Sequence, residues 1–314
     1  MPAGEGALDP RFAKPRTLVF GIGAQKAATS WLDHYLRDHP EVCLPVRKEQ
    51  HYWTTHRLEG ASDRRARVAR QLAKIERRSL WKRLTRTPKR RAVDEAWRRN
   101  AAMLAAPDPG HRAYADTLFQ TYRGQPVAGE ITPAYGLLGA ETFAEMAALG
   151  RDVRFLFVMR DPVDRLISGV RMNVRKERPG EGPAPGRFAE RLAEALDDPE
   201  DPGLLRSRYD RTIRRLESVV PVERICYFFF ETLFRQEEMD RLADFLGIAR
   251  RPARFEKKVN AGKAAAERPS AEAEARAMEA LAPVYDFVRA RFGAQVPEKW
   301  RRASPATAAV ALSA

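Results

Sequence analysis

Apolar runs rich in β-branched and aromatic residues alternate along this chain with segments whose apolar positions recur every three or four residues. The runs predict five strands, at residues 17–21, 42–44, 126–131, 153–159 and 224–230. The helical periodicity predicts helices over 29–38, 140–149, 162–176, 236–246 and 281–292. Strands that alternate with helices favour a parallel sheet with helices on both faces, so the expected fold class is α/β.

One folded domain accounts for most of the chain. Its 314 residues are 44% hydrophobic and 31% charged, which is enough apolar material for a full hydrophobic core. We expect a domain over 17–300, a flexible N-terminus over 1–16, and a disordered, low-complexity tail over 301–314. A basic helical insertion over 60–105 interrupts the alternation of strands and helices.

The positive charge is concentrated in this insertion. Residues 63–99 hold 15 Lys or Arg and four Asp or Glu, so they carry +11 of the chain's net +14. Val68, Leu72, Ile75 and Leu84 recur at near-helical spacing, which predicts an amphipathic helix with a basic outer face. Such a patch suits a polyanionic partner, namely nucleic acid, an acidic glycan or an anionic lipid surface. The alternative is a solvated insertion that binds nothing.

The composition argues against several classes of protein. No apolar stretch approaches the roughly 18 residues of a membrane span, and the polar N-terminus lacks the apolar run of a secretory signal. Cys43 and Cys226 are too few for a disulfide framework or a cysteine-based zinc site. We therefore expect a cytoplasmic protein in a reducing compartment.

Candidate chemistry begins at the small-residue loop 23–28, between the first strand and the first helix. The N–H groups of such a loop and the helix dipole point at an anion, and Lys26 adds a mobile positive charge. The triphosphate pattern G-x-x-x-x-G-K-[ST] does not match, because Lys26 lies three residues before Thr29. The dinucleotide pattern G-x-G-x-x-G also fails. An ordinary turn with a surface lysine is the alternative.

The segment Gln25-Lys26-Ala27-Ala28-Thr29-Ser30-x-Leu32 resembles the 5′-phosphosulfate-binding loop of sulfotransferases. That family transfers a sulfuryl group from 3′-phosphoadenosine 5′-phosphosulfate (PAPS) to a hydroxyl or amine. Many members carry glycine where Ala28 stands. The resemblance implies that residues 25–30 bind the donor and that Lys26 neutralises the leaving 5′-phosphate. It also makes Trp31 a candidate to stack on adenine, unless this side chain belongs to the core.

A second match follows the most apolar strand. Arg160-Asp161-Pro162-Val163-Asp164-Arg165, with Ser168 eight residues after Arg160, resembles the 3′-phosphate site of the same family. The resemblance implies that Arg160 and Ser168 grip this phosphate. Arg160 leaves its strand at the carboxyl edge of the sheet, where open α/β folds bind ligands. The alternative is that Arg160 only pairs with a neighbouring aspartate.

A third match supplies a candidate base. Lys48-Glu49-Gln50-His51-Tyr52-Trp53 is similar to the K-E-x-x-F-F segment of carbohydrate sulfotransferases of the heparan sulfate type, in which the glutamate is the catalytic base. Thr54 stands where some of these enzymes carry an acid. His51 would orient Glu49, contact the acceptor or act as the base itself. The alternatives are a surface pair of Glu49 with Lys48, and a structural histidine.

Weaker matches extend the likeness over most of the chain outside the insertion. The segment 130–135 (EITPAY) is similar to the family's E-K-T-P-x-Y, with Ile131 replacing the lysine, and 230–233 and 245–248 resemble its late strand–helix unit. The segment 260–263 (NAGK) stands where the family places a loop over the nucleotide. The resemblance thereby adds Asn260, Gly262 and Lys263 to the donor-binding residues.

These matches imply a PAPS-dependent sulfotransferase with a P-loop-type, three-layer α/β domain and 3′,5′-adenosine bisphosphate as product. We expect no metal, because positioned cations can stabilise a transferring group that carries less charge than a γ-phosphate. A carbohydrate acceptor is preferred, since the basic segment suits an acidic glycan or a lipid-linked sugar. One alternative is a P-loop nucleotide kinase or triphosphatase that requires magnesium. Another is a nucleic-acid-binding protein that uses residues 64–99, which would leave both phosphate motifs without a purpose.

Overall fold

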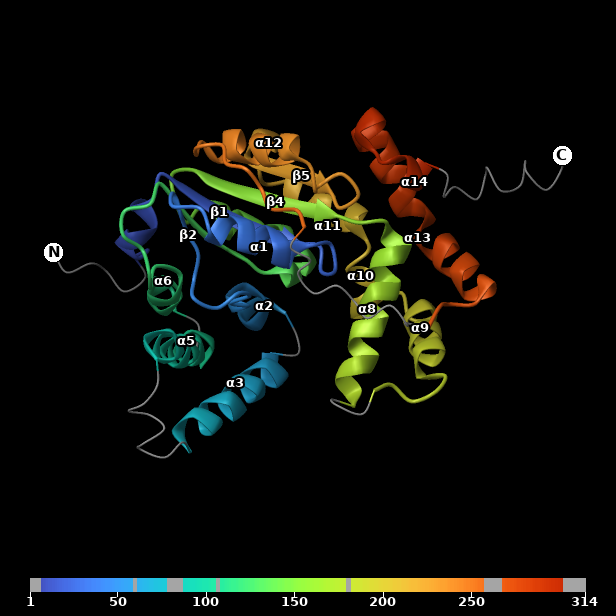
Figure 1. Ribbon diagram of the computed structural model, residues 1–314, viewed down its shortest axis with the longest axis horizontal. Helices are drawn as coiled ribbons and strands as arrows, with labels where there is room; N and C mark the ends of the chain where they lie inside the picture. The colour runs from blue at the N-terminus through green and yellow to red at the C-terminus, as the bar shows by residue number, and fades with distance from the viewer. Residues whose placement is uncertain are drawn as a thin grey trace.

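A computed structural model describes residues 7–58, 61–77, 87–105, 108–178, 182–256 and 267–301. Its centre is a five-stranded sheet in which every paired strand is parallel, in the order β2-β3-β1-β4-β5. The strands are β1 (Thr17–Gly23), β2 (Val42–Cys43), β3 (Val127–Ile131), β4 (Val153–Met159) and β5 (Ile225–Phe229). Helices surround the sheet and form the predicted three-layer α/β fold (Figure 1).

The helices predicted from the periodicity are present. Those predicted are α1 (Thr29–Arg37), α7 (Ala140–Ala147), α8 (Pro162–Glu177), α12 (Gln236–Leu246) and α13 (Ala271–Phe292), the last beginning before the expected Leu281. Short helices that the pattern did not predict are α2 (Tyr52–Arg57), α6 (Arg112–Leu118), α9 (Arg187–Asp197), α10 (Pro202–Leu205), α11 (Tyr209–Glu217) and α14 (Glu298–Arg301). Of these, α9 and α11 pack on other helices, α9 on α8 and both on α13.

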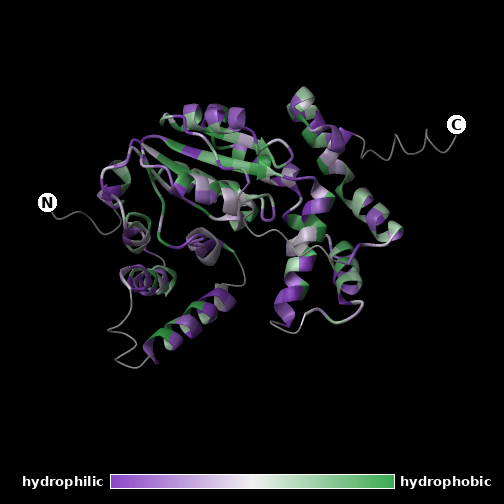
Figure 2. Ribbon diagram, in the orientation of Figure 1, coloured by the Kyte–Doolittle hydropathy of each residue, from purple (hydrophilic) through white to green (hydrophobic). Residues whose placement is uncertain are grey.

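In its described part, the basic insertion contains the amphipathic helices α3 (Ala61–Glu76) and α5 (Pro88–Ala105), which pack on each other and on α2. Val68 and Ile75 are buried, as the helical spacing predicted, whereas Leu84 lies outside the described residues. The strands are strongly hydrophobic, whereas α3 carries hydrophilic residues along much of its length (Figure 2). These two helices therefore fold onto the domain and keep a charged outer surface.

The N-terminal segment differs from expectation. Residues 10–13 form the 3₁₀ helix η1 (Pro10–Ala13), and Phe12 is buried against Tyr114 and Phe119. The N–H of Asp9 donates to the carbonyl of Gly110, which ties the segment to the loop before α6. Residues 7–16 are thus packed onto the domain, because one aromatic side chain anchors an otherwise polar stretch. The expected tail over 301–314 lies, after Arg301, outside the described residues.

The strand order explains where a ligand can bind. The chain passes from β1 to β2 and β3 on one side of the sheet and then continues with β4 and β5 on the other. Parallel sheets bind ligands at such a reversal, beyond the carboxyl ends of the strands. The loops that follow β1, β2, β3 and β4 carry the motifs identified from the sequence. The topology therefore brings these motifs to one edge of the sheet.

Candidate functional site

The loop after β1 has the geometry of an anion cradle. Lys26 and Ala28 both lie in the left-handed region, with φ of 76° and 61°. This backbone is costly for a residue with a Cβ atom, and such strain concentrates at functional sites. Ala28 occupies the N-cap of α1 without a side-chain oxygen, so no side chain caps the first N–H groups of the helix. These donors suit an anion at the start of α1.

The surroundings of Lys26 are positive. Its side chain is half-buried, and burial lowers the pKa of its ammonium group, with further lowering by Arg175, Arg160, Lys176 and Arg165. All four of these neighbouring side chains carry a positive charge. A cluster of cations at the end of β1 repels further positive charge and attracts an anion such as a phosphate or sulfate.

Arg160, at the end of β4, packs against this loop. Its Nη1 donates to the backbone carbonyl of Lys26 at 3.3 Å, and its guanidinium carbon lies 4.9 Å from the centre of the Phe230 ring. The ion pair with Asp164 is loose, at 3.7 Å, and the buried Nε has no partner among the described residues. Ser168 lies half-buried on α8, about two turns beyond Arg160. Arg160 is thus joined to the loop after β1 as well as to the neighbouring acid.

Lys48 links the loop after β2 to the start of α1. Its Nζ lies 3.0 Å from Glu49 Oε1, 3.2 Å from Ser30 Oγ and 3.4 Å from Thr29 Oγ1. The sequence prediction gave this lysine only the role of a surface partner for Glu49. The adjacent Lys-Glu pair was a usable signal, but the hydroxyl contacts depend on the tertiary fold. Lys48 therefore joins the anion cradle to the candidate base.

The Glu49 carboxylate has a second contact, to His51. The distance from Glu49 Oε2 to His51 Nε2 is 3.4 Å, and the Glu49 side chain is 39% exposed. Burial raises the pKa of Glu49, but the contact with His51 and the charge of Lys48 outweigh it and bring the pKa to about 2. Glu49 is therefore ionised at neutral pH.

His51 is neutral at the same pH. Burial, with the nearby charges of Arg64 and Arg47, lowers the pKa of His51 to about 4 against the raising effect of Glu49. His51 Nε2 faces the ionised Glu49 carboxylate, which can only accept, so we assign the ring proton to Nε2. The Thr54 hydroxyl donates to the His51 backbone carbonyl at 3.2 Å and lies 3.4 Å from His51 Nδ1. Thr54, in place of an acid, leaves His51 without a carboxylate on its other side.

The backbone of this loop is also strained. Glu49 and His51 have φ of 62° and 60°, so four of the five non-glycine residues with positive φ in the described ranges lie in the loops after β1 and β2. His51 forms the N-cap of α2, while the following Tyr52 and Trp53 are buried in the core. The aromatic pair of the motif therefore anchors the loop; of the polar residues before it, Lys48 and Glu49 are partly exposed, whereas Gln50 and His51 are buried.

Glu130, at the end of β3, binds the same loop through its carboxylate. It is 1% exposed and accepts hydrogen bonds from the Gln50 N–H (3.1 Å), Tyr114 Oη (2.5 Å), Thr132 Oγ1 (2.5 Å) and Tyr135 Oη (2.8 Å). Burial raises the pKa of Glu130, and these four bonds oppose the rise. Because it is buried, Glu130 supports the position of Glu49 without reaching a substrate itself. In the E-I-T-P-x-Y segment the glutamate, threonine and tyrosine all belong to this network.

The basic insertion also supports the loop. Asn100 of α5 is buried and donates through Nδ2 to the Gln50 carbonyl oxygen at 3.2 Å. The guanidinium carbon of Arg47 lies 3.4 Å from the centre of the Trp97 ring. The sequence prediction missed these contacts, although a buried asparagine among apolar helix positions is a recognisable signal. The insertion is therefore part of the architecture of the site.

The remaining candidates for donor binding are Trp31 and residues 260, 262 and 263. Trp31 is 6% exposed, and its ring stacks on Tyr35 and on Phe255. It also borders a cavity of about 400 Å³, which Arg251 and Arg254 line as well. Its role toward adenine stays a prediction. Residues 260, 262 and 263 lie outside the described residues.

Among the described residues, no group of three or more His, Cys, Asp and Glu side chains is arranged to hold a metal ion. In the same ranges, no helix is both long and apolar enough to cross a membrane.

Comparisons with known proteins agree with this geometry. A family model described as "Sulfotransferase family" matches residues 19–252, a span that includes the loops after β1, β2, β3 and β4 and ends before residue 260. No curated protein matches the chain at a significant level. A sulfotransferase from Alicyclobacillus acidocaldarius aligns with a TM-score of 0.60 at 22% identity, over 92% of this chain and 100% of that one, which shows the same fold.

Two further solved structures are more distant. The sulfotransferase domain of the Synechococcus PCC 7002 olefin synthase has a TM-score of 0.44 at 15% identity, over 75% of this chain and 74% of that one. The sulfotransferase domain from the curacin biosynthetic pathway has a TM-score of 0.42 at 12% identity, over 76% of this chain and 75% of that one.

Proposed function

Because this chain belongs to the sulfotransferase family, we propose that it transfers a sulfuryl group from PAPS to a hydroxyl or amine of an acceptor. The observation that carries the proposal is the position of Lys48, within 3.4 Å of Thr29 and Ser30 on one side and of Glu49 on the other. A donor phosphosulfate at the start of α1 and an acceptor beside Glu49 would then meet at one cation. In-line transfer requires this kind of juxtaposition.

The reaction with a hydroxyl acceptor balances as a single displacement. The acceptor oxygen forms a bond to sulfur while the bond from sulfur to the 5′-phosphate oxygen breaks. Glu49 takes the acceptor proton, a contribution typically worth about 10²–10⁴-fold. The leaving group is 3′,5′-adenosine bisphosphate, whose 5′-phosphate Lys26 and the N–H groups of residues 25–30 would stabilise. Lys48 would face the sulfuryl oxygens.

The donor's other end would lie along β4 and β5. Arg160 and Ser168 are proposed to bind the 3′-phosphate, with Trp31 beside the adenine and residues 260, 262 and 263 over the nucleotide. The buried Nε of Arg160, which has no partner among the described residues, supports its assignment, because a charged group with an unused donor favours an anionic ligand. The cations around Lys26 support the 5′ end.

We favour Glu49 over His51 as the base. Both groups are in the correct protonation state at neutral pH, since Glu49 is ionised and His51 is neutral. Of the two, Glu49 contacts Lys48, the cation that links it to the loop 23–28, the proposed donor loop. His51 is proposed to orient the carboxylate through Nε2.

We propose a carbohydrate as acceptor, since the Lys48–Trp53 motif resembles that of carbohydrate sulfotransferases. With Ile131 in place of the family's lysine, the acceptor site lacks one cation at the end of β3 and depends on others. The proposed compartment remains the cytoplasm, because the described cysteines, Cys43 and Cys226, are buried thiols without a disulfide. The proposed domain extends from the packed segment at residue 7 to about residue 300.

Calorimetric titration tests the donor. We expect 3′,5′-adenosine bisphosphate to bind without added metal and ATP with magnesium to bind weakly or not at all. Incubation with sulfur-labelled PAPS and a saccharide panel then tests transfer. Tight binding of magnesium-ATP with no binding of the bisphosphate would favour the nucleotide kinase or triphosphatase instead.

A further inference from the structure

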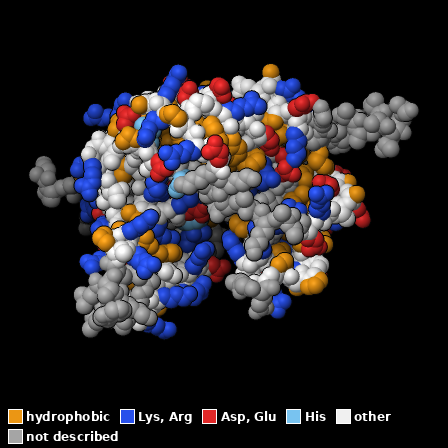
Figure 3. All heavy atoms as spheres, viewed as in Figure 1, with side chains coloured by type: hydrophobic (Ala, Val, Ile, Leu, Met, Phe, Trp, Pro, Cys, Tyr) orange, Lys and Arg blue, Asp and Glu red, His pale blue; other side chains and the backbone are white. Residues whose placement is uncertain are grey.

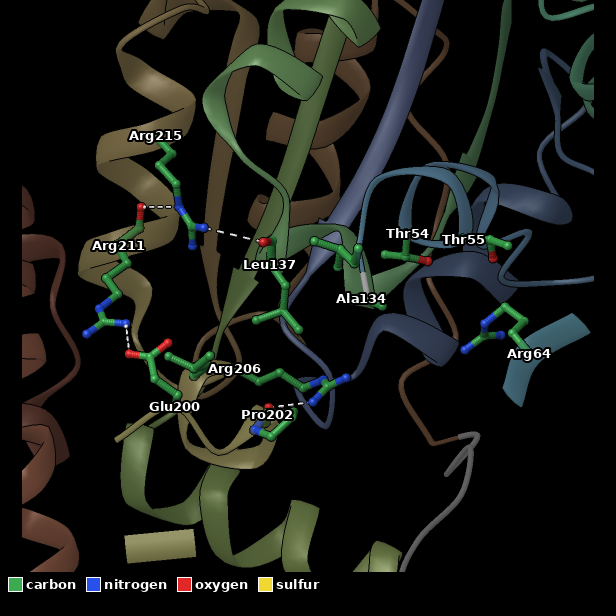
Figure 4. A pocket seen from close by; sticks show the side chains of 12 residues that line it. Thr54, Thr55, Arg64, Ala134, Leu137, Glu200, Pro202, Arg206, Arg211 and Arg215 are labelled. Carbon is green, nitrogen blue, oxygen red and sulfur yellow. Dashed lines mark hydrogen bonds and ion pairs between the residues drawn. The ribbon is translucent and has the colours of Figure 1, made fainter. Parts of the chain in front are cut away.

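A cavity of about 550 Å³ opens beside α2, on the acceptor side of the candidate base. Its lining includes Thr54 and Thr55 of α2, Arg64 of α3, Arg206 after α10, and Arg211 and Arg215 of α11. This volume is within the roughly 300–1,000 Å³ of small-molecule sites. In Figure 4, Arg206 reaches from one side of the cavity toward Arg64 on the other. Segments distant in the sequence thus form one basic cavity.

Two of the four arginines are already occupied. Arg211 forms an ion pair with Glu200 at 3.1 Å. Arg215 donates to the backbone carbonyls of Arg211 at 3.0 Å and of Leu137 at 3.3 Å. These two side chains shape the wall of the cavity.

The other two arginines have no acidic partner within the described ranges. Arg206 donates a hydrogen bond to the carbonyl of Pro202, and its buried Nε has no hydrogen-bond partner among the described residues. The side chain of Arg64 is half-buried and makes no hydrogen bond to a described residue. Burial lowers the pKa of both groups, and repulsion from Arg67 and Arg206 adds to the effect at Arg64. Half-buried guanidinium groups that form no ion pair with a described acid favour an anionic ligand between them.

A chain of contacts connects the cavity to the base. Thr54, which lines the cavity, lies 3.4 Å from His51, and His51 lies 3.4 Å from Glu49 Oε2. The other carboxylate oxygen, Oε1, faces Lys48 and the donor loop. The positive charge of Arg64 also acts on Glu49. The two oxygens of Glu49 therefore point toward the donor loop and toward the cavity side.

We propose that this cavity binds an oxyanion carried by the acceptor, a carboxylate, sulfate or phosphate, between Arg64 and Arg206, while a neighbouring acceptor group reaches Glu49. The inference rests on the proposed sulfuryl transfer and names its substrate class as an acidic acceptor. It gives the insertion a specific role, because α3 supplies one of the two binding arginines. In Figure 3, Lys and Arg side chains surround a recess between the α3 and α8 sides of the molecule, through which an acidic acceptor would be attracted.

The test uses Arg64→Ala and Arg206→Ala in the full chain, with Arg70→Ala as matched control. Arg70 is an exposed arginine on the same helix, α3, and does not line the cavity. The probes are tetrasaccharides of equal length that carry a uronate carboxylate, a sulfate, a phosphate or no charge. Their affinities are measured by calorimetry with 3′,5′-adenosine bisphosphate bound, and their KM values with PAPS as donor.

We expect at least one anionic probe to bind the wild-type protein tighter than the neutral one, and the carboxylate, sulfate and phosphate arms identify which. Each alanine variant should weaken that probe tenfold or more, because a charge-assisted contact is lost. The neutral probe, the bisphosphate affinity and the Arg70 variant should be unchanged. Arg206→Lys should restore part of the affinity, since lysine keeps the charge but not the planar fork.

Two results would overturn the inference while leaving sulfuryl transfer intact. One is a wild-type protein that binds the bisphosphate but no anionic probe better than the neutral one. The other is a preference for anionic probes that survives in both alanine variants. A wild-type protein that neither binds the bisphosphate nor transfers sulfate would instead refute the proposed function itself.

Discussion

Replacing Glu130 by alanine should weaken both the fold and the transfer reaction, although this side chain is almost fully buried. Its carboxylate accepts four hydrogen bonds, three from the hydroxyls of Tyr114, Thr132 and Tyr135 and one from the backbone N–H of Gln50. The hydroxyls can turn or bond to a water in the space left by the carboxylate. The N–H of Gln50 has no such freedom, because the backbone fixes its direction.

The expected loss in free energy of unfolding for Glu130→Ala follows from the hydrogen bonds that nothing replaces. Hydrogen bonds to a charged group are worth about 1.5–3 kcal/mol each. If the Gln50 bond and one hydroxyl bond are lost, the free energy of unfolding falls by about 3–6 kcal/mol. Glu130→Gln keeps one carbonyl oxygen for Gln50 and Thr132, while Tyr114 and Tyr135 can accept from the new amide, so its loss should be only about 1–2 kcal/mol.

Three measurements separate a local effect from general unfolding. Urea denaturation gives the free energy of unfolding, and amide hydrogen exchange reports on the Gln50 N–H. Calorimetry with 3′,5′-adenosine bisphosphate reports on the donor loop, which Glu130 does not touch. For Glu130→Ala we expect faster exchange at Gln50 and a lower kcat, because Glu49 is no longer held in place, with donor affinity close to wild type.

Tyr114→Phe is the matched control, because it removes one donor to Glu130 and leaves the Gln50 bond. It should cost about 1.5–3 kcal/mol and preserve kcat. If Glu130→Ala loses activity while the Gln50 amide stays fully protected, Glu130 does not act by holding this loop and the reasoning is wrong. An equal loss of kcat in the Tyr114 variant would have the same consequence.

The remaining predictions concern the donor and the base. Arg160→Ala should weaken 3′,5′-adenosine bisphosphate by about 1.5–3 kcal/mol but leave 5′-AMP nearly unchanged in calorimetry; equal losses would remove Arg160 from the 3′-phosphate site. Glu49→Gln should abolish turnover with donor affinity retained, whereas an active Glu49→Gln beside a dead His51→Ala would make the histidine the base. A base must be deprotonated, so activity is lost as pH falls through its folded-state pKa. With pKa values of about 2 for Glu49 and about 4 for His51, neither group titrates between pH 5 and 8, and kcat/KM should show no step from them in that range. Lys48→Met removes a contribution that lowers the Glu49 pKa, so the acid limb of kcat/KM should move to higher pH; an unmoved limb would show that Lys48 does not act on this carboxylate.

Local sequence determined the framework of this protein. The strand Val153–Met159 and the helix after Pro162 follow from contiguous apolar residues, proline placement and periodicity, which are properties of a few neighbouring positions. Strand–helix alternation then restricts the sheet to parallel pairing and gathers the loops at one edge. The motifs after β1 and β4 could therefore be identified as candidate phosphate sites from the sequence alone.

Contacts between distant segments could be identified only in the tertiary structure. Lys48 reaches α1, Asn100 of the insertion binds Gln50, and Glu130 collects donors from three elements, and none of these partners follows from spacing in the sequence. The short helices α9 and α11 were not predicted, although their buried apolar positions recur at helical spacing, Phe188 with Leu192 and Ile213 with Leu216.

The basic insertion shows most clearly what the sequence determines and what only the tertiary structure decides. Its composition established a concentration of positive charge and an amphipathic helix, but charge alone does not distinguish a solvated surface from a binding site. Folding turns Arg64 toward the same cavity as Arg206, some 140 residues away, and turns Trp97 onto Arg47. Periodicity reports which face of a helix is apolar, whereas the partner of that face depends on packing across the whole chain.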